Sequence, residues 1–258
     1  PAFREGVVVL RVENLSKIYD DGTEALKDVS FEVPDGEFVA VIGLSGSGKS
    51  TLLRCINRLI DPTEGEIWWN DTQLSHITGE ELRRARRRIG MIFQHFNLVE
   101  RSTVLTNVLS GRLGYVNPLA SILNRFPQED IDRAHANLIR VGLDTKSSNR
   151  ADELSGGQRQ RVGIARALMQ EPEMILADEP VASLDPALAH SIMRYLLEIN
   201  QDDGITVLCS LHFLDLVQHY STRAIALNDG ELVFDGTPDE IDDERFLHIY
   251  GQEAERIG

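Results

Sequence analysis

The sequence has no long run of apolar residues. No segment of the 258 residues approaches the roughly 20 consecutive apolar residues that a helix needs to cross a bilayer. Residues 1–6 contain no basic flank followed by an apolar stretch, so the sequence does not begin with a recognisable secretory signal. We therefore expect a cytosolic protein.

Cysteine is scarce as well. The two cysteines, Cys55 and Cys209, are isolated and far apart in the sequence. A disulfide framework or a cysteine-based metal site requires more cysteines at closer spacing. We therefore expect two reduced thiols in or near the hydrophobic core.

Positively charged residues are also few relative to negatively charged ones. Asp and Glu outnumber Lys and Arg by 41 to 26, which gives a formal net charge of −15. Such a surface repels phosphates, so we expect no nucleic-acid partner, and we interpret the arginine-rich residues 79–88 as a solvated helix face. Only four of the cations are lysines. Scarce lysine with abundant carboxylates suits a high-salt cytoplasm, where ions screen the repulsion, but an ordinary acidic protein fits as well.

What the sequence does contain is an alternation of apolar runs and helical patterns. Residues 38–42 form a near-continuous apolar run, which is typical of a strand buried on both faces. A helical pattern follows it and runs up to a stop at Asp61-Pro62. Further strands are predicted at residues 7–12, 29–33, 173–178, 205–210 and 224–227. The alternation predicts an α/β fold with a mostly parallel sheet.

The stretch from residue 96 to residue 153 looks helical and irregular. It is interrupted at Asn117-Pro118, and Pro127 predicts the start of a helix that runs to Gly142. Trp68 and Trp69 are expected in β structure rather than in a ligand site.

The most specific motif is a phosphate-binding loop pattern, G-x-x-x-x-G-K-[ST], directly after the apolar run. Glycines let the backbone wrap closely round a phosphate, and N–H groups at the following helix N-terminus point at the anion. Lys49 is expected to reach the β- and γ-phosphates, and the Ser50 hydroxyl to bind Mg²⁺. The residues predicted to hold ATP here are Gly43, Leu44, Ser45, Gly46, Ser47, Gly48, Lys49, Ser50 and Thr51.

Two adjacent acidic residues end the predicted strand at 173–178. A carboxylate at the carboxyl end of a strand can hold the Mg²⁺ of a nucleotide, and Asp178 fits that role through a bound water. Glu179 would then lie beside the γ-phosphate and act as general base on the attacking water. Alone this motif is weak, but it follows a phosphate-binding loop.

A second anion-binding pattern precedes a helix predicted at residues 159–169. The segment reads Leu154-Ser155-Gly156-Gly157-Gln158, and it would present free N–H groups to an anion. Because the loop already supplies one phosphate site, a second such element makes sense if it closes on the nucleotide of another subunit.

With these motifs in this order, the chain resembles an ABC-transporter ATPase over roughly residues 7–236. The resemblance implies that Tyr19 stacks on adenine, that Gln94 senses Mg²⁺ and the water, and that His212 contacts the γ-phosphate. It also implies a head-to-tail dimer of two copies with two ATP molecules between them. The residues that would act on the neighbour's ATP are Ser155, Gly156, Gly157, Gln158 and Asp185.

The resemblance also implies how the chain is divided. The fold would be a P-loop cassette with a mostly parallel core, an antiparallel β subdomain and an inserted helical subdomain. The divisions fall at residues 7–95 and 159–240 for the two parts of the core, 96–158 for the helical subdomain and 241–258 for a short tail. Leu44 and Ala177 depart from the commoner family residues, and we expect little effect from either.

Three stretches look like the phosphonate-importer branch of the family: residues 111–115 with the extension to 127, 177–186 and 204–207. This resemblance implies a motor bound to integral-membrane permease subunits at the cytoplasmic face of the membrane, served indirectly by a solute-binding protein. The extension lies in the part of the family fold that docks on the permease. The cargo rests on family association alone, because cargo does not touch this subunit.

Other functions remain as alternatives. A methionine or polar amino acid importer motor is the nearest, although the methionine type usually carries a regulatory domain and only a short tail follows Gly236 here. Non-transport ABC proteins usually carry two cassettes or long coiled coils, and no sustained heptads are present. A P-loop kinase or GTPase would need neither the segment at 154–158 nor His212.

Overall fold

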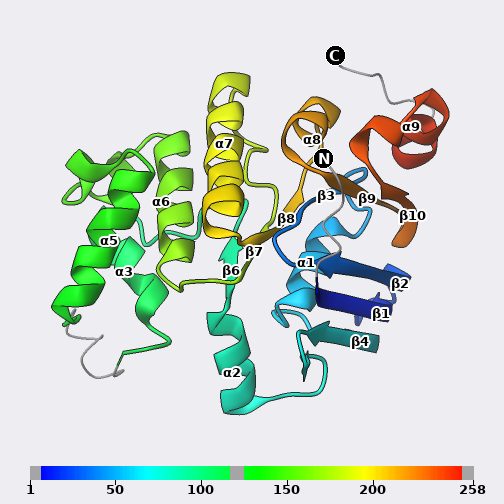
Figure 1. Ribbon diagram of the computed structural model, residues 1–258, viewed down its shortest axis with the longest axis horizontal. Helices are drawn as coiled ribbons and strands as arrows, with labels where there is room; N and C mark the ends of the chain where they lie inside the picture. Colours follow the sequence, from blue (N-terminus) through cyan, green and yellow to red (C-terminus); the bar gives the residue numbers. More distant parts are fainter. Residues whose placement is uncertain (1–6, 117–124, 252–258) are drawn as a thin grey trace.

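The computed structural model describes residues 7–116 and 125–251, so the interruption expected at Asn117-Pro118 lies outside the described residues (Figure 1). A six-stranded sheet forms its centre, in the order β10-β9-β3-β8-β7-β6. All neighbours in this sheet are parallel except β10, which pairs antiparallel with β9. The strands are β3 (Phe38–Ile42), β6 (Ile89–Ile92), β7 (Met174–Ala177), β8 (Thr206–Ser210), β9 (Arg223–Asn228) and β10 (Glu231–Gly236). The predicted α/β fold with a mostly parallel sheet is confirmed.

Alternate residues of the central strands face two separate cores. Phe38, Ala40 and Ile42 of β3 pack with apolar residues of the helices α6 (Gly156–Leu168), α7 (Pro186–Asp203) and α8 (Leu214–Tyr220). Val39 and Val41 point the other way, into a core shared with α1 (Lys49–Ile56) and a second sheet. Strands covered on both faces read as continuous apolar runs, which is why the sequence located β3 correctly.

The second sheet is antiparallel and four-stranded, in the order β2-β1-β4-β5. Its strands are β1 (Val8–Ile18), β2 (Glu24–Pro34), β4 (Glu64–Trp69) and β5 (Thr72–Gln73). Trp68 and Trp69 lie in this sheet, as expected. β1 and β2 are much longer than the predicted stretches because their polar halves pair through irregular register. There the backbones of Asn14 and Asp28 have positive φ, and the Asn14 Nδ2 donates to Asp28 at 2.7 Å.

The end of α1 differs from the prediction. The apolar pattern runs to Ile60, but the helix ends at Ile56. Arg58 has φ 52°, its N–H donates to the carbonyl of Cys55, and the Leu59 N–H reaches back to that of Arg54. These bonds are a Schellman ending, which satisfies the last carbonyls of the helix and turns the chain away.

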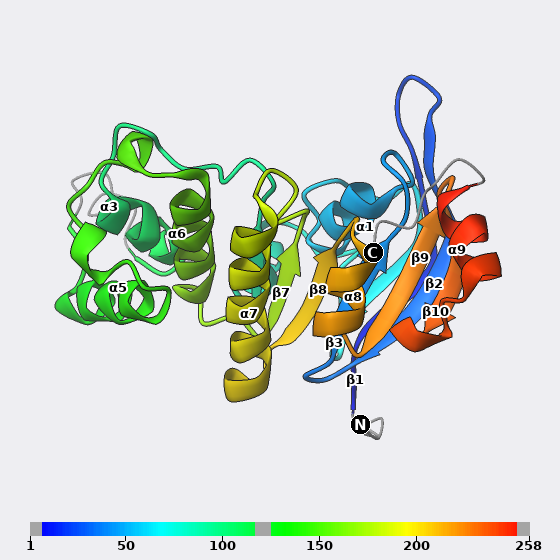
Figure 2. The ribbon, with the colours of Figure 1, turned by 90° about the horizontal axis from the view of Figure 1, so that it is seen from above.

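The remaining helices gather at one end of the molecule (Figures 1 and 2). α3 (Val104–Leu109) and α5 (Gln128–Arg140) pack against α6, and α5 follows Pro127 as predicted. We call α3, α5 and α6 the helical half, and the six-stranded sheet with α1, α7 and α8 the sheet half. Short 3₁₀ turns occur at Ser110–Arg112, Asp144–Lys146, Ala151–Glu153 and Pro238–Glu240, and α2 (Gly79–Arg87) lies close to the edge strand β6.

A further difference concerns the start of a helix. α6 begins at Gly156 rather than at residue 159. The described part of the expected tail forms α9 (Asp243–Tyr250), whose Phe246, Ile249 and Tyr250 are buried against the main core.

Both thiols are buried in the core, as expected. Burial raises the pKa of Cys55 to about 12, and it raises the pKa of Cys209 as well. Among the described residues, no helix combines the length and apolar character that crossing a membrane would require.

Candidate functional site

The site lies at the carboxyl edge of the central sheet. β3, β7 and β8 run parallel, so the segments that follow them meet at one edge, where ligands bind in open α/β sheets. Residues 43–51 follow β3 and are called here the nucleotide loop. Asp178 and Glu179 follow β7, and His212 comes two residues after β8.

The nucleotide loop is shaped by glycines that no other residue could replace without displacement. Gly43 and Gly48 have φ 140° and 106°. A Cβ on Gly43 would lie 2.1 Å from the Leu227 carbonyl oxygen, and one on Gly48 would lie 2.4 Å from that of Ala25. The loop therefore wraps tightly against its neighbours just before α1, in a conformation that glycine adopts readily and other residues do not.

Lys49 folds back over this loop. Its Nζ donates to the carbonyls of Gly43 and Leu44, both at 2.8 Å, and the side chain is buried. Burial lowers the pKa of Lys49, while the nearby Glu179 and Asp178 act in the opposite direction. The ammonium is thus held inside the curve of the loop, where a phosphate oxygen would meet it.

Asp178 is fully buried and joins two residues of α1. It accepts a hydrogen bond from the Ser50 hydroxyl at 2.6 Å and one from the Arg54 guanidinium at 3.0 Å. The two residues predicted to hold Mg²⁺, Ser50 and Asp178, therefore lie in contact. Carboxylate and hydroxyl oxygens are donors that suit this ion.

Glu179 lies between two other predicted site residues. Its Oε1 is 2.6 Å from Nε2 of His212, and its Oε2 accepts from the Gln94 amide at 2.9 Å. A carboxylate only accepts hydrogen bonds, so the proton of the first contact belongs to His212. The Glu179 backbone has φ 49°, a conformation that costs about 1–3 kcal/mol, and its N–H donates to Ser210 at 2.7 Å. The carboxylate is therefore held in place by both its side chain and its backbone.

Tyr19 follows β1 and lies beside the same loop. Its hydroxyl is 3.1 Å from the Thr51 hydroxyl, and the Lys17 ammonium lies 5.4 Å from the ring centre. The ring predicted to stack on adenine is thus fixed next to the first turn of α1.

Residues 154–158, called here the signature segment, lie elsewhere. Ser155 caps α6 and exchanges hydrogen bonds with Gln158, whose N–H it accepts at 3.3 Å. Gly157 packs so closely on Leu188 that a Cβ there would lie 3.1 Å from the leucine side chain. α6 and α1 lie on opposite sides of β7 in both Figure 1 and Figure 2. The signature segment therefore does not join the nucleotide loop within one chain.

Asp185 belongs to neither group of contacts. It caps α7 by accepting the Leu188 N–H at 3.1 Å. Its position in the chain, between Glu179 and Leu188, puts it on the segment that connects β7 to the helix packed on the signature segment.

Two residues at the site were missed from the sequence. Arg54 ion-pairs with Asp178, and its position one turn after Ser50 on an expected helix could have indicated it. Ser210 orients the Glu179 backbone from the end of β8, and no local pattern distinguishes it from any other serine.

Comparisons with known proteins show which family the chain is similar to. A family model described as ABC transporter matches residues 26–182. The chain is 54% identical over 250 residues to a Phosphonates import ATP-binding protein PhnC of Bdellovibrio bacteriovorus, covering 96% of each chain. A relative of the same description from Halalkalibacterium halodurans is 50% identical over 244 residues, with 95% of each chain covered.

Solved structures show the same fold. The dimeric post-hydrolysis ATP-binding cassette MJ0796, bound to ADP and phosphate, is 36% identical with a TM-score of 0.77, covering 89% of this chain and 98% of that one. The ADP form of the cassette MJ1267 is 33% identical with a TM-score of 0.81, covering 93% and 95%.

Proposed function

The chain belongs to the ABC transporter family of ATP-binding proteins and hydrolyses ATP, and from this premise we propose that it drives an importer of phosphonates or related organophosphorus anions. The cargo is supported by the two relatives described as phosphonate import proteins, each covered almost completely. The motor function is supported most directly by Glu179, which is held between Gln94 and His212 beside the Ser50–Asp178 pair.

In the proposed mechanism, Glu179 accepts a proton from the water that attacks the γ-phosphorus. His212 and Gln94 now share its carboxylate, and both would turn toward the γ-phosphate and the water when ATP is bound. Lys49 would exchange its carbonyl partners for β- and γ-phosphate oxygens. Tyr19 would stack on the adenine.

Ser50, Asp178 and Gln94 are the proposed partners of Mg²⁺. The ion would neutralise charge on the β- and γ-phosphates during transfer. Ser50 offers its hydroxyl oxygen directly, whereas Asp178 already accepts from Ser50 and Arg54 and would act through a bound water. Asp178 is fully buried, so its carboxylate is held in place.

We propose that each ATP lies between two copies of the chain. The signature segment presents the N-terminus of a 13-residue helix, which attracts anions, and it lies away from the nucleotide loop of its own chain. Ser155, Gly156, Gly157, Gln158 and Asp185 would thus act on the neighbour's nucleotide. The dimeric MJ0796 structure supports this arrangement, and loss of the γ-phosphate would reopen the dimer.

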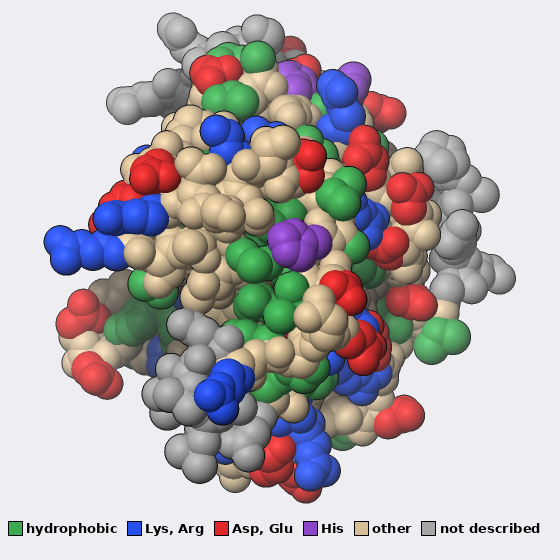
Figure 3. All heavy atoms as spheres, turned by 90° about the vertical axis from the view of Figure 1, so that its left-hand side faces the viewer, with side chains coloured by type: hydrophobic (Ala, Val, Ile, Leu, Met, Phe, Trp, Pro, Cys, Tyr) green, Lys and Arg blue, Asp and Glu red, His purple; other side chains and the backbone are tan. Residues whose placement is uncertain are grey.

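The proposed partners beyond the second copy are permease subunits in the membrane and, indirectly, a solute-binding protein. Figure 3 looks onto the end formed by the helical half, where hydrophobic side chains gather in the middle of the face and charged ones surround them. Exposed hydrophobic residues that come from this part of the chain include Val99, Leu113 and Ile139. Docking there would hold the chain at the cytoplasmic face of the membrane. We also propose that the chain divides into core, helical subdomain and tail at residues 95/96, 158/159 and 240/241.

Uptake of a labelled alkylphosphonate tests the proposal, with labelled methionine and phosphate as parallel solutes. Deleting the gene should abolish phosphonate uptake alone. The wild-type gene should restore it, and a Glu179→Gln gene should not. Unchanged phosphonate uptake together with loss of another solute would overturn the cargo and leave the motor intact.

A further inference from the structure

The end of β8 supplies a side chain that contacts both of the acidic residues at the end of β7. Ser210, the last residue of β8, is fully buried. Its Oγ accepts the Glu179 N–H at 2.7 Å and lies 3.5 Å from the Asp178 Oδ1. The first contact is short for a hydrogen bond and the second is long, so the bond to the Glu179 backbone dominates. Ser210 thus holds the proposed general base by its backbone.

The pairing of β7 explains why Glu179 needs this hydroxyl. Successive N–H groups of a strand point to opposite neighbours, and the Asp178 N–H donates to the Ile92 carbonyl of β6 at 2.8 Å. The next N–H, that of Glu179, therefore points toward β8. The ladder between β7 and β8 ends before this point, so a side-chain hydroxyl takes the place of a strand carbonyl.

The backbone of Glu179 also has a conformation that needs support. Its φ of 49° lies in the left-handed region, which is unfavourable for a residue with a side chain. Pro180 follows it, and a proline favours an extended backbone in the residue before it. Such a conformation persists where neighbouring contacts fix it. The bond to Ser210 is a contact of this kind, because full burial leaves the serine little room to move.

The bond to Ser210 differs in one respect from the contacts of the Glu179 carboxylate. His212 and Gln94 now hold that carboxylate, and in the proposed mechanism both turn toward the γ-phosphate and the water when ATP is bound. The bond between the Glu179 N–H and Ser210 involves neither of these side chains, so it can persist through the change. The general base then keeps its place while its side-chain partners move.

We propose that Ser210 is a positioning residue for ATP hydrolysis, which fixes the Glu179 backbone so that the carboxylate stays aligned with the attacking water. The inference rests on the proposed role of Glu179 as general base. A base must lie within hydrogen-bond reach of the proton it removes, so a small displacement lowers the rate of the chemical step. ATP binding should not depend on Ser210, because the hydrogen bonds of its hydroxyl within the described part of the chain are to residues 177–179.

Steady-state ATP hydrolysis by Ser210→Ala tests this proposal. The kcat should fall roughly tenfold, whereas the KM for ATP should stay within about twofold of the wild type. Ser210→Thr keeps the hydroxyl oxygen and should restore most of the kcat. An unchanged kcat in Ser210→Ala, or a change confined to KM, would overturn the proposal. A Ser210→Thr protein that melts like the wild type but hydrolyses ATP as slowly as Ser210→Ala would do the same.

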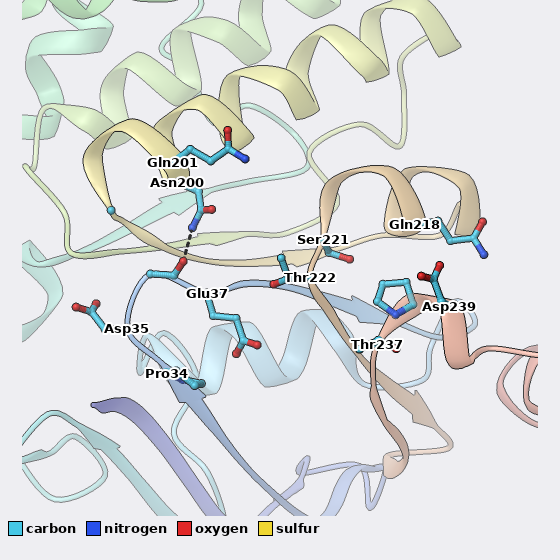
Figure 4. Close-up of a pocket in the computed structure, with 13 residues that line it drawn as sticks. Pro34, Asp35, Glu37, Asn200, Gln201, Gln218, Ser221, Thr222, Thr237 and Asp239 are labelled. Carbon is cyan, nitrogen blue, oxygen red and sulfur yellow. Dashed lines mark hydrogen bonds between the residues drawn. The ribbon is translucent and has the colours of Figure 1, made fainter. Parts of the chain in front are cut away.

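Thr206→Val is the matched control. Thr206 is the first residue of β8 and is fully buried, and its Oγ1 accepts the Gly36 N–H at 2.9 Å and lies 3.4 Å from Oδ1 of Asp35. Figure 4 shows this opposite edge of the sheet, where Asp35 lines a cavity of about 610 Å³ and none of the proposed ATP-site residues does. Thr206→Val should lower the melting temperature about as much as Ser210→Ala and keep the kcat. Equal losses of kcat in the two variants would contradict a specific role for Ser210.

Combining Ser210→Ala with Glu179→Gln shows whether Ser210 acts through Glu179. Because Glu179→Gln removes the base, adding Ser210→Ala should change the residual single-turnover rate by less than about twofold. A further loss of roughly tenfold would show that Ser210 acts independently of Glu179, against the proposal.

Glu179→Gln alone separates this inference from the proposed function. If that protein keeps its turnover, the assignment of Glu179 as general base fails. If Glu179→Gln is slow and Ser210→Ala has the kcat of the wild type, the base assignment stands and only the role of Ser210 is lost.

Discussion

The sheet half and the helical half hold their site residues in opposite ways. In the sheet half, Lys49, Asp178 and Glu179 already have partners within the site, and the distances are those of direct hydrogen bonds. In the helical half, the hydrogen bonds of Ser155 within the described part of the chain are to its own helix, at Gln158 and Arg159. The sheet half contains the side chains proposed for ATP hydrolysis, but it does not enclose a nucleotide. The helical half presents a helix N-terminus that can bind an anion, but it has no catalytic side chain.

This difference explains why one chain is an incomplete enzyme in the proposed mechanism. The rigid groups of the sheet half can be built by one chain because β3, β7 and β8 end side by side. The signature segment packs on Leu184 and Leu188, which fixes its direction but keeps it apart from its own nucleotide loop. In the proposed dimer a second copy would cover the nucleotide, so substitutions in the two halves should impair the protein in different ways.

The largest effect is expected in the sheet half, from Glu179→Gln. Removing the general base should lower ATP turnover by roughly 10²- to 10⁴-fold while ATP still binds. Because the γ-phosphate then persists, the dimer should accumulate and be visible by size-exclusion chromatography with ATP. Glu173→Gln, which changes an exposed carboxylate just before β7, is the control and should keep turnover.

Two results together would remove Glu179 from this role. They are ample turnover by the Glu179→Gln protein and a monomeric elution at saturating ATP. Glu179 would then be neither the general base nor the residue whose loss traps the dimer.

The next effect belongs to the helical half, at Ser155. Ser155→Ala removes the cap of α6, worth about 1 kcal/mol, together with the proposed phosphate contact in trans. Ser155→Asp keeps a capping oxygen and suits a helix N-terminus, but it sets a negative charge against the neighbour's phosphate. We expect turnover to fall roughly tenfold in the first and further in the second.

Thermal melting separates the two roles of Ser155. The Ser155→Asp protein should melt close to the wild type, whereas Ser155→Ala should melt lower. If Ser155→Asp instead turns over ATP like the wild type, the serine is a helix cap and nothing more.

A third, smaller effect concerns the contact between α2 and the helical half. The guanidinium groups of Arg87 and Arg112 lie 5.2 and 4.1 Å from the centre of the Tyr115 ring, and the Tyr115 hydroxyl donates to the Gln170 carbonyl at 2.8 Å. It thereby ties α2 to the segment after α3 and to the end of α6. Tyr115→Ala should cost about 1–2 kcal/mol, and Tyr115→Phe, which keeps the ring, about half of that.

Hydrogen exchange would show which segments lose stability in Tyr115→Ala. Faster exchange should be confined to residues 104–116 and to the start of the loop after α6. An increase spread evenly over the central sheet would mean that Tyr115 supports the whole fold rather than the junction.

The sequence described continuous segments better than helix ends and contacts between strands, and the reason is physical. The nucleotide loop and β3 are continuous in the chain, so local patterns contain all of their information. The ends of α1 and α6 depend instead on the Schellman ending at Arg58 and the cap at Ser155, which apolar periodicity does not record. Ser210 acts only because β8 lies beside β7, and no local pattern can supply that contact.

The smallest effect is a difference in how the stability contributed by one carboxyl group in each half depends on pH. Glu171, in the loop after α6, bonds to Arg133 and Arg112, and these contacts, led by Arg133, lower its pKa below the ordinary 4.5. A lowered folded pKa contributes stability above the unfolded value, and this stability is lost as pH falls through the folded one. Glu171→Gln should thus melt slightly below the wild type at pH 7, and the difference should vanish well below pH 4.5.

Glu37 in the sheet half gives the opposite sign, which sharpens the comparison. Burial raises its pKa, so its ionised form costs stability above the unfolded value, and protonation relieves that cost as pH falls. Glu37→Gln should therefore lose less stability at pH 7 than the loss of an ion pair with Arg223 would suggest, and its melting difference from the wild type should move against that of Glu171→Gln as pH falls. If the melting differences of the two variants instead change in the same direction as pH falls, the opposite pKa shifts of Glu37 and Glu171 would be contradicted.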